Sequence, residues 1–576
     1  MVGTGITRTI RALRLRPGAR RGGKDLLELP IRSGPVNVLR QAALRTANLG
    51  LTAAYGVYRA DPALWRFTAR HYHPGLERFA RLNAWMICQH ASLDVPAYQD
   101  HLARHGFEFR WWDLQAYAPT SKDDYVKVYP EEQRCWDGRI EMPGTVVDES
   151  SGSSGTPSNW MRSKLELDTV HKNVAGYVSM LFGTEDLFCI NAFSMGAWAT
   201  GTNTGQALAK IAMVKNTGPD LETILNTLRH FGPRHTYLIT AYPPFLKHLV
   251  DRLEAAGDEF REFRLNGFVG GEAMTEGLRD YVERRFDRVY SGYGASDLTI
   301  GMGGETDLTV TLRKALERDT AFRERLLGRD EHRTPMIFQY NPLETYLEVD
   351  ESGDLIATIN SASVMSPRLR YNIGDEARIV SFPEMVSLAE DFPALTGRLK
   401  EAYRRQRMKL PFLLLFGRSD STISYMGANI YPLDVQNGIY RDVGTARLIS
   451  SFQIELTPVA DQEHEHRPTL HIQLRDPSVF PEAALDEAAR GRTARAVADG
   501  VVAHLAEVSR DFAQSLKEDP STAEVAVVVH DHGEGPFAEG ASKIKDVYLR
   551  TTVGADESME GGAVGRPADA DPGQGS

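Results

Sequence analysis

LFCINAF, at residues 187–193, is the first of three apolar runs that have the length of a buried strand. HTYLITAY follows at 235–242 and NGFVGGE at 266–272. A loop comes after the first run, and a segment with helical spacing of its apolar residues comes after each of the other two. Because strands that alternate with helices are typical of a sheet flanked by helices, residues 144–416 predict an α/β fold.

Different patterns lie on either side of this region. Apolar residues at three- and four-residue spacing predict helices from about 37 to 105. Beyond residue 417, two strand-like runs, a long Ala-rich amphipathic stretch and a third strand-like run predict a small α+β domain. The expected division is a basic tail at 1–36, a large domain at 37–416 with a helical lead-in at 37–143, a small domain at 417–553 and a disordered tail at 554–576.

The composition is that of an ordinary globular protein. Of the 576 residues, 42% are hydrophobic and 25% are charged, which excludes a disordered chain, a collagen and a coiled-coil rod. The net charge of −11 argues against a nucleic-acid partner, since such proteins carry strongly basic faces. Cys88, Cys135 and Cys189 form no CxxC pair, so we expect no disulfide framework, no cysteine zinc site and a cytoplasmic location.

The first 24 residues are basic and contain no acid. Their cations are Arg8, Arg11, Arg14, Arg16, Arg20, Arg21 and Lys24. Such a segment is either a solvated tail or a peripheral contact with an anionic membrane surface. No stretch of the sequence is long and apolar enough to predict an integral membrane segment.

A glycine- and hydroxyl-rich stretch, DESSGSSGTP, occupies residues 148–157. Small residues let backbone N–H groups approach an anion, and the hydroxyls add donors, so the stretch is chemically suited to a polyphosphate. It is neither a Walker loop nor a hydrolase elbow, because GK[ST] and GxSxG are absent. The alternative is a flexible connector. We call residues 150–156 the serine loop: Ser150, Ser151, Gly152, Ser153, Ser154, Gly155 and Thr156.

Four further stretches carry groups suited to nucleotide chemistry, although each alone could be a turn. YSGYGASD at 290–297 offers an aromatic face for a base and a carboxylate for Mg²⁺. RYNIGD at 370–375 ends in Asp375, which could accept hydrogen bonds from a ribose diol. FGRSD at 416–420 lies near the expected domain boundary, and EGASKIK at 539–545 lies near the end of the chain.

In this order and spacing the five stretches resemble those of the adenylate-forming superfamily of acyl-CoA synthetases, and within it the phenylacetate–CoA ligase-like branch. The resemblance runs over about residues 83–550. The serine loop is similar to the family's SSGTTGxP loop, GGE at 270–272 to its G-A-E turn, and YGASD at 293–297 to its YGxSE. YNIGD at 371–375 is similar to Y-R-T-G-D, and residues 417–432 to GRSDD…GxNVFP.

This resemblance implies an ATP-dependent enzyme that converts a small-molecule carboxylic acid to an acyl-adenylate and passes the acyl group to a thiol, most simply that of CoA. It implies a large domain of β-sheets with flanking helices and a small mobile α+β domain hinged at Asp420. The implied ATP site comprises the serine loop, Gly271, Glu272, Tyr293, Gly294, Asp375 and Arg418, with Asp297 for Mg²⁺ and Lys543 as the catalytic residue. An apolar acyl or aryl pocket is expected at Tyr242, Phe245 and Gly270.

The sequence departs from the family pattern in several places. The usual lysine of the phosphate loop is missing, Asp297 replaces a glutamate, Asn372 replaces an arginine and Ser542 replaces a glycine. Segments near 312–328 and 389–409 have no counterpart. The acceptor could therefore be an amine or a carrier protein in place of CoA, and a non-catalytic nucleotide-binding protein on the same fold is the remaining alternative.

Three other features have a simpler structural explanation. His71 and His73, like His464 and His466, have the i, i+2 spacing that places two imidazoles on one face of a strand. No third metal ligand is evident, so exposed histidines are expected. Cys189 lies inside an apolar run and is expected to pack in the core and not to act as a nucleophile.

Overall fold

The structure is a computed structural model. It describes residues 35–538 apart from 150–157, 197–198, 330, 332, 419–422, 426–427, 459–465, 510–511, 514–515 and 517–519. The serine loop, Asp420 and Lys543 therefore lie outside the described residues. No helix within those limits has the length and apolar character needed to cross a membrane.

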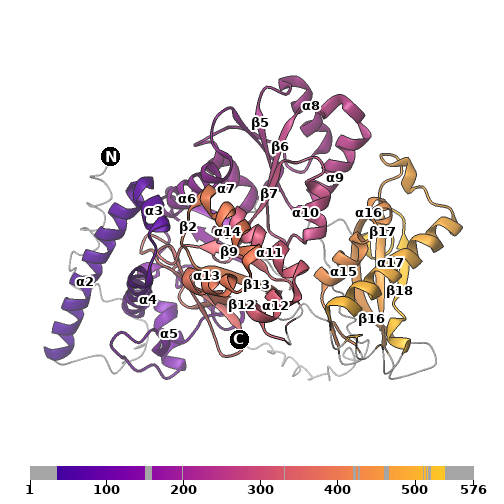
Figure 1. Cartoon of the computed structure of the whole chain (residues 1–576). Helices are drawn as coiled ribbons and strands as arrows, with labels where there is room; N and C mark the ends of the chain where they lie inside the picture. The colour runs from indigo at the N-terminus through magenta and orange to yellow at the C-terminus, as the bar shows by residue number, and fades with distance from the viewer. Residues whose placement is uncertain are drawn as a thin grey trace, which may run out of the picture.

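A mixed sheet forms the centre of the molecule (Figure 1). Its strands are β3 (Leu187–Asn191), β4 (Met213–Asn216), β5 (Thr236–Ala241), β6 (Arg264–Gly270), β7 (Arg288–Ala295), β8 (Thr299–Gly304), β9 (Met336–Tyr340), β10 (Thr345–Val349), β11 (Asp354–Ile359), β12 (Tyr371–Val380) and β13 (Phe412–Arg418). Their order across the sheet is β10-β11-β12-β13-β9-β8-β7-β6-β5-β3-β4.

The sheet changes from parallel to antiparallel pairing at β7. The strands from β4 to β7 pair in parallel, whereas those from β7 to β10 pair antiparallel. Every residue of β3 is buried, as expected for a parallel strand that is covered on both faces. The α/β prediction is confirmed, and the strand–helix alternation read from the sequence belongs to the parallel half.

Helices flank this half and connect its strands (Figure 1). They are α6 (Lys164–Phe182), α7 (Ala199–Leu208), α8 (Leu221–Phe231), α9 (Pro243–Ala255) and α10 (Glu276–Val282), with the short η4 (Gly257–Phe260) after α9. Ser163, Asp220 and Thr275 each accept a backbone N–H at the start of a helix, which satisfies a donor that has no intrahelical partner. Gly183 and Gly232, both with positive φ, end α6 and α8.

Helices occupy most of residues 35–104 of the described chain, as the sequence predicted. They are α2 (Pro35–Ala60), α3 (Pro62–Arg70), α4 (Pro74–Asp94) and α5 (Pro96–Arg104), and each begins at a proline, whose fixed φ suits the first helical position. Buried residues of α4, among them Trp85 and Ile87, join the main core. Short elements follow: η1 (Leu114–Ala116), η2 (Lys122–Val126), η3 (Trp136–Gly138), β1 (Val146–Glu149) and β2 (Asn159–Arg162).

The two segments without a family counterpart fold into one layer. They form α11 (Asp307–Arg318), α12 (Thr320–Leu327), α13 (Phe382–Glu390) and α14 (Pro393–Gln406). Leu312, Phe322 and Leu395 from this layer share a hydrophobic cluster with Phe412 and Leu414 of β13. The layer therefore covers the antiparallel half of the sheet, with α11 and α12 connecting β8 to β9 and α13 and α14 connecting β12 to β13.

A smaller α+β unit follows β13. It contains β14 (Ile423–Tyr425), β15 (Ala428–Ile430), α15 (Pro432–Tyr440), α16 (Val443–Leu448), β16 (Ile449–Pro458), β17 (His466–Leu474), η5 (Pro481–Ala483), α17 (Glu487–Val508), η6 (Pro520–Ala523), β18 (Ala526–His530) and η7 (Gly535–Phe537). β17 pairs antiparallel with β16 and parallel with β18, and the unit has a hydrophobic cluster of its own. The α+β prediction is confirmed, and β16 begins directly after α16, which Asp442 caps.

This unit packs on α9 of the large part. The buried Lys247 ammonium donates to the carbonyl oxygens of Ala446 and Ile449, each at 2.6 Å. Arg475 of the small unit forms an ion pair with Asp251, one turn further along α9. The contact thus depends on buried charges that have specific partners.

A buried ion network joins α10, α11 and the strand end at β8. Arg279 contacts Glu276 at 3.0 Å and Glu305 at 2.7 Å, and Arg313 contacts Glu276 at 2.8 Å. All four side chains are at most 2% exposed. Burial by itself would raise the pKa of Glu276, but the charges of Arg279 and Arg313 outweigh burial and lower it.

We expect Arg279→Met to lower the free energy of unfolding by about 3–5 kcal/mol, because Glu276 and Glu305 would keep buried charges without this partner. Since the folded-state pKa of Glu276 is lowered, the stabilisation is complete at neutral pH and is lost as the pH falls below about 4. Arg229→Met, which breaks an exposed pair with Glu259, is the control and should change stability little. Urea unfolding at neutral pH measures both, and equal losses would contradict the assignment.

Candidate active site

Two nucleotide-site residues that are far apart in the sequence meet in the structure. The hydroxyl of Tyr293, on β7, donates to Oδ2 of Asp375, on β12, at 2.7 Å. Burial raises the pKa of Tyr293 well above its ordinary value, and the adjacent Asp375 charge adds to the rise. Tyr293 is therefore a neutral donor at physiological pH.

The surroundings of this pair bear on the roles that the motifs imply. One face of the Tyr293 ring stacks on Phe338, with centroids 5.5 Å apart, which leaves only the other face for a base. Asp375 lies opposite Arg418 in the β12–β13 ladder. The backbone of Arg418 is described but its side chain is not. The structure therefore brings Asp375 and Arg418, the two residues expected to bind the ribose, together through the pairing of their strands. Gly294 lies where a Cβ would come within 2.8 Å of the Thr299 carbonyl oxygen.

Asp297 lies in the turn between β7 and β8 and is held from several directions. Its Oδ1 accepts from the Trp160 indole at 3.0 Å, and its Oδ2 accepts from the Tyr371 hydroxyl at 2.9 Å. Its backbone carbonyl accepts from Arg368 at 3.0 Å. A carboxylate oxygen can accept more than one contact, and Mg²⁺ commonly takes one or two carboxylates beside substrate phosphates, so a single fixed carboxylate fits a Mg²⁺ site.

Trp160 and three buried arginines form a cluster at the base of the serine loop that the sequence analysis missed. The Arg368 guanidinium carbon lies 4.4 Å and that of Arg134 lies 5.3 Å from the Trp160 ring centroid. The side chains of all three arginines are at most 3% exposed. We call Arg134, Trp160, Arg162 and Arg368 the arginine cluster. The pattern NWMR at 159–162, which puts Trp160 and Arg162 on one face of a strand, is the one sequence signal that pointed to it.

The members of the arginine cluster differ in how their charges are compensated. Arg162 pairs with Asp148 at 3.2 Å and with Glu166 at 3.0 Å. Burial and then the charge of Arg162 lower the pKa of Arg368 to about 9. Nη2 of Arg368, and Nε and Nη1 of Arg134, are buried with no hydrogen-bond partner within the described part of the chain. Arg134 pairs with Glu131 at 3.4 Å. The cluster thus keeps unused N–H donors, and Arg368 is its one arginine without an ion pair among the described residues.

The expected acyl-pocket residues gather at the ends of β5 and β6. Gly270 ends β6, and at Gly271, with φ of +84°, an added Cβ would lie 2.5 Å from the Tyr242 ring. Burial, and then the Glu272 charge, raise the pKa of Tyr242 to about 12. Phe245 is 2% exposed and packs in the main core, so it supports this wall from behind.

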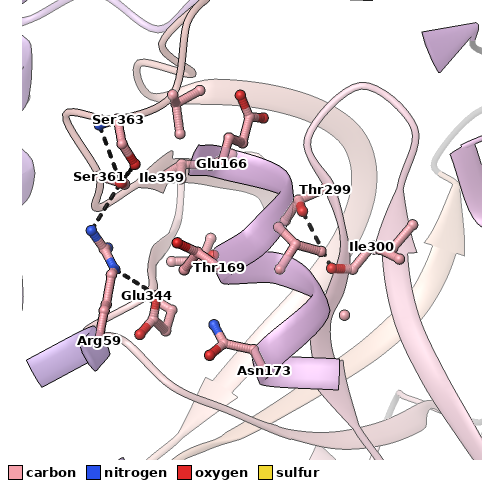
Figure 2. Close-up of a pocket in the computed structure, with 14 residues that line it drawn as sticks. Arg59, Glu166, Thr169, Asn173, Thr299, Ile300, Glu344, Ile359, Ser361 and Ser363 are labelled. Carbon is pink, nitrogen blue, oxygen red and sulfur yellow. Dashed lines mark hydrogen bonds and ion pairs between the residues drawn. The ribbon is translucent and has the colours of Figure 1, made fainter. Parts of the chain in front are cut away.

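A cavity lies between α6 and the start of β8 (Figure 2). Glu166 and Thr169 of α6 line one wall, and Thr299 and Ile300, just after the Asp297 turn, line another. The opposite wall carries Arg59, which contacts Glu344 at 3.3 Å. Through Glu166 the cavity is adjacent to the arginine cluster.

Flanks of the serine loop are described although the loop is not. β1 and β2 pair antiparallel with Glu149 opposite Asn159, so the loop connects the two strands of a hairpin. The proposed roles of the loop, of Asp420 and of Lys543 stay predictions.

The simpler explanations offered for other residues agree with the structure where it describes them. His71 and His73 are exposed, and His73 accepts from the Gly75 amide at the start of α4. Cys189 is fully buried, and burial raises its pKa to about 12, so it is a core residue. His464 lies outside the described residues, and only the backbone of His466 is described.

No protein-family model and no curated protein match the chain. Among solved structures it is similar to 2-hydroxyisobutyryl-CoA ligase in the postadenylation state in complex with R3-HIB-AMP, with 15% identity and a TM-score of 0.54 over 82% of this chain and 88% of that chain. The same ligase with 2-HIB-AMP gives a TM-score of 0.53 at the same identity and coverage. The amide bond synthetase McbA from Marinactinospora thermotolerans gives 0.39 at 13% identity over 68% of this chain and 67% of that chain.

The likeness to the first two structures confirms that the chain has the fold of an adenylate-forming acyl-CoA ligase, as the motifs predicted. The phenylacetate–CoA ligase-like branch within that superfamily stays a prediction.

We expect Gly271→Ala to destabilise the protein by about 1–3 kcal/mol, because the new methyl group overlaps the Tyr242 ring and the backbone has positive φ. Gly397→Ala is the matched control, since Gly397 is exposed within α14 with no atom near its would-be Cβ. It should be neutral or stabilise by up to about 1 kcal/mol through helix propensity. Urea unfolding compares the two, and an unchanged midpoint for Gly271→Ala would refute the close packing.

Proposed function

We propose that this chain uses ATP to convert a carboxylic acid to an acyl-adenylate, releases pyrophosphate and then transfers the acyl group to the thiol of CoA. The observation that carries the proposal is the hydrogen bond from Tyr293 to Asp375, with Arg418 opposite Asp375 in the ladder. The hydrogen bond and the strand pairing together join Tyr293, Asp375 and Arg418, which the motifs independently assign to the nucleotide. The chain that carries them has the fold of an adenylate-forming ligase. A ligase of similar fold holds an acyl-AMP, which supports the same intermediate here.

In the first step a carboxylate oxygen of the acid attacks the α-phosphorus of ATP. A new P–O bond forms as the bond to the β-phosphate breaks, and pyrophosphate leaves. Because both reactants are anions, the site must supply alignment and positive charge. The serine loop binds the β- and γ-phosphates through N–H and hydroxyl donors, and Lys543 lies between the attacking carboxylate and the α-phosphate.

The arginine cluster compensates for the missing lysine of the phosphate loop. The charge of Arg162 is balanced by Asp148 and Glu166, whereas Arg368 forms no ion pair with the described residues. A buried guanidinium stabilises a nearby anion more strongly than an exposed lysine, because little water screens it. In this proposal Arg368 raises the affinity of the loop for polyphosphate without contacting the reacting atoms.

The remaining groups position the nucleotide and the acid. Asp375 and Arg418 bind the ribose, and the face of Tyr293 opposite Phe338 stacks on adenine with Gly294 beside it. Gly271 and Glu272 separate the nucleotide from an apolar acyl or aryl pocket walled by Tyr242. Bound Mg²⁺, held by Asp297 together with the phosphates, supplies positive charge to the polyphosphate.

The second step needs a different pose of the small unit. Rotation about Asp420 removes Lys543 and admits the CoA thiol, whose sulfur attacks the acyl carbon and displaces AMP. The contacts of Lys247 and Asp251 with the small unit belong to one pose and must break for another. An amine or a carrier-protein thiol is the alternative acceptor.

The three cysteines, buried and unpaired, support a reducing, cytoplasmic location, with peripheral membrane contact possible through the basic tail.

A pyrophosphate-release screen of aryl and short-, medium- and long-chain acids, with and without CoA, tests the function. We expect ATP- and Mg²⁺-dependent release with at least one acid class, and AMP with an acyl-CoA when CoA is added. Release that requires an amine in place of CoA would change the acceptor. ATP binding without release for any acid would favour the non-catalytic alternative.

We expect Asp375→Ala to raise the KM for ATP by roughly tenfold to a hundredfold, since each charge-assisted hydrogen bond to a ribose hydroxyl contributes about 1.5–3 kcal/mol. For Asp375→Asn, which keeps an acceptor for the Tyr293 hydroxyl, the KM for ATP should lie between that of the parent protein and that of Asp375→Ala. Asp391→Ala, at an exposed position after α13, is the control and should leave the KM unchanged. A near-normal KM and kcat in Asp375→Ala would refute the ribose assignment.

A further inference from the structure

Two histidines at the end of α5 face an aspartate from η2. His101 and His105 are four residues apart, which places them on one face of the helix, and their ring centroids lie 4.3 Å apart. Asp124 approaches from η2, and one potential ligand atom of each of the three residues lies within 4.8 Å of the others. No motif in the sequence analysis includes these residues.

Hydrogen bonds to backbone carbonyls fix the tautomer of each imidazole. Nε2 of His101 lies 2.9 Å from the Pro119 carbonyl oxygen, and Nδ1 of His105 lies 2.8 Å from that of His101. Because a carbonyl only accepts, both of these nitrogens carry the proton. Nδ1 of His101 and Nε2 of His105 therefore carry lone pairs, which is how metal-binding histidines are oriented in proteins.

The Nδ1 lone pair of His101 is available to a ligand, because no described group donates to it. The side chain is fully buried, and its Nδ1 has no hydrogen-bond partner among the described residues. Asp124 uses Oδ1 to accept from the amide and hydroxyl of Ser121, which orients the carboxylate and leaves Oδ2 for a ligand.

Other groups around the cluster are compatible with a cation. Arg104, on the same helix, is paired with Asp100 at 3.2 Å. The ring of Tyr125 meets His101 edge to face, with centroids 5.5 Å apart, and forms an apolar wall. The positive charge of Arg104, next to the cluster, is thus compensated by Asp100.

We propose that His101, His105 and Asp124 bind one divalent transition metal ion, with Zn²⁺ the best match, at a site separate from the nucleotide site. Two imidazoles and one carboxylate are a ligand set that suits Zn²⁺ and leaves a fourth, open position. Mg²⁺ and Ca²⁺ prefer oxygen ligands and fit poorly.

Such an ion would fasten α5 to the segment that supports β12. The Thr120 amide donates to the Arg370 carbonyl at 3.1 Å, and the Asn372 amide donates to the Thr120 carbonyl at 2.8 Å. Asp124 follows four residues later in the same segment, and Asp375 follows Asn372 on the same strand. The metal ion therefore stabilises the pairing that positions the nucleotide-site strand, and it takes no part in the chemical step.

Zn²⁺ titration of the full chain, stripped with a chelator, tests this proposal by calorimetry, and Co²⁺ substitution reports the geometry by absorption. We expect one Zn²⁺ per chain, a tetrahedral Co²⁺ spectrum and a rise in the thermal midpoint on binding. His105→Ala, at an exposed position, and Asp124→Asn should each weaken binding by roughly 100-fold or more, since even an outer-shell partner is worth about 10–100-fold.

Two matched controls separate this site from general histidine or carboxylate binding. His71→Ala removes an exposed histidine that makes the same contact with the carbonyl four residues earlier, at 2.9 Å. Asp123→Asn removes the adjacent carboxylate, which pairs with Lys127. Both should bind Zn²⁺ as the parent does. Absence of saturable binding, or equal binding in His105→Ala, Asp124→Asn and the controls, would overturn the proposal, whatever the outcome of the pyrophosphate assay.

Discussion

One buried guanidinium holds the candidate site together. Arg162 is 3% exposed, so its charge is stable only if acidic groups and carbonyls surround it. It pairs with Asp148 and Glu166, and it donates to the carbonyls of Ser296 and Leu298 on either side of Asp297. The serine-loop hairpin, α6 and the β7–β8 turn are therefore tied to one side chain, and their relative positions depend on that charge being satisfied.

The sheet explains why the other candidate residues converge beside this side chain. β5, β6 and β7 are neighbouring parallel strands, so their carboxyl ends lie at one edge, where ligands bind in open α/β sheets. Tyr242 follows β5, Gly271 follows β6 and Tyr293 lies near the end of β7. The expected acyl wall at Tyr242 and the Tyr293–Asp375 pair are consequently placed at the same edge, as the proposed reaction requires.

Local patterns predicted a large part of this arrangement. Strand runs and helical spacing identified the elements of the parallel half, the helical lead-in and the α+β unit, because burial on one face imposes a period of two or of about 3.6 residues. The motifs also marked Tyr293, Asp297 and Asp375 as site residues. They gave no indication of the layer made by α11 to α14, since two segments of helical pattern do not reveal that they pack together.

Contacts between segments far apart in the sequence could be identified only from the folded structure. Tyr293 and Asp375 are 82 residues apart, and three strands separate β7 from β12 in the sheet. Trp160 and Asp297 are 137 residues apart, and no periodicity predicts that an indole occupies an oxygen of the proposed metal ligand. Periodicity records which face of an element is buried, and so the element types follow from the amino-acid order alone. The partner across that buried face is set by strand order and crossover, which is why the arginine cluster and the His101–His105–Asp124 group emerge only in three dimensions.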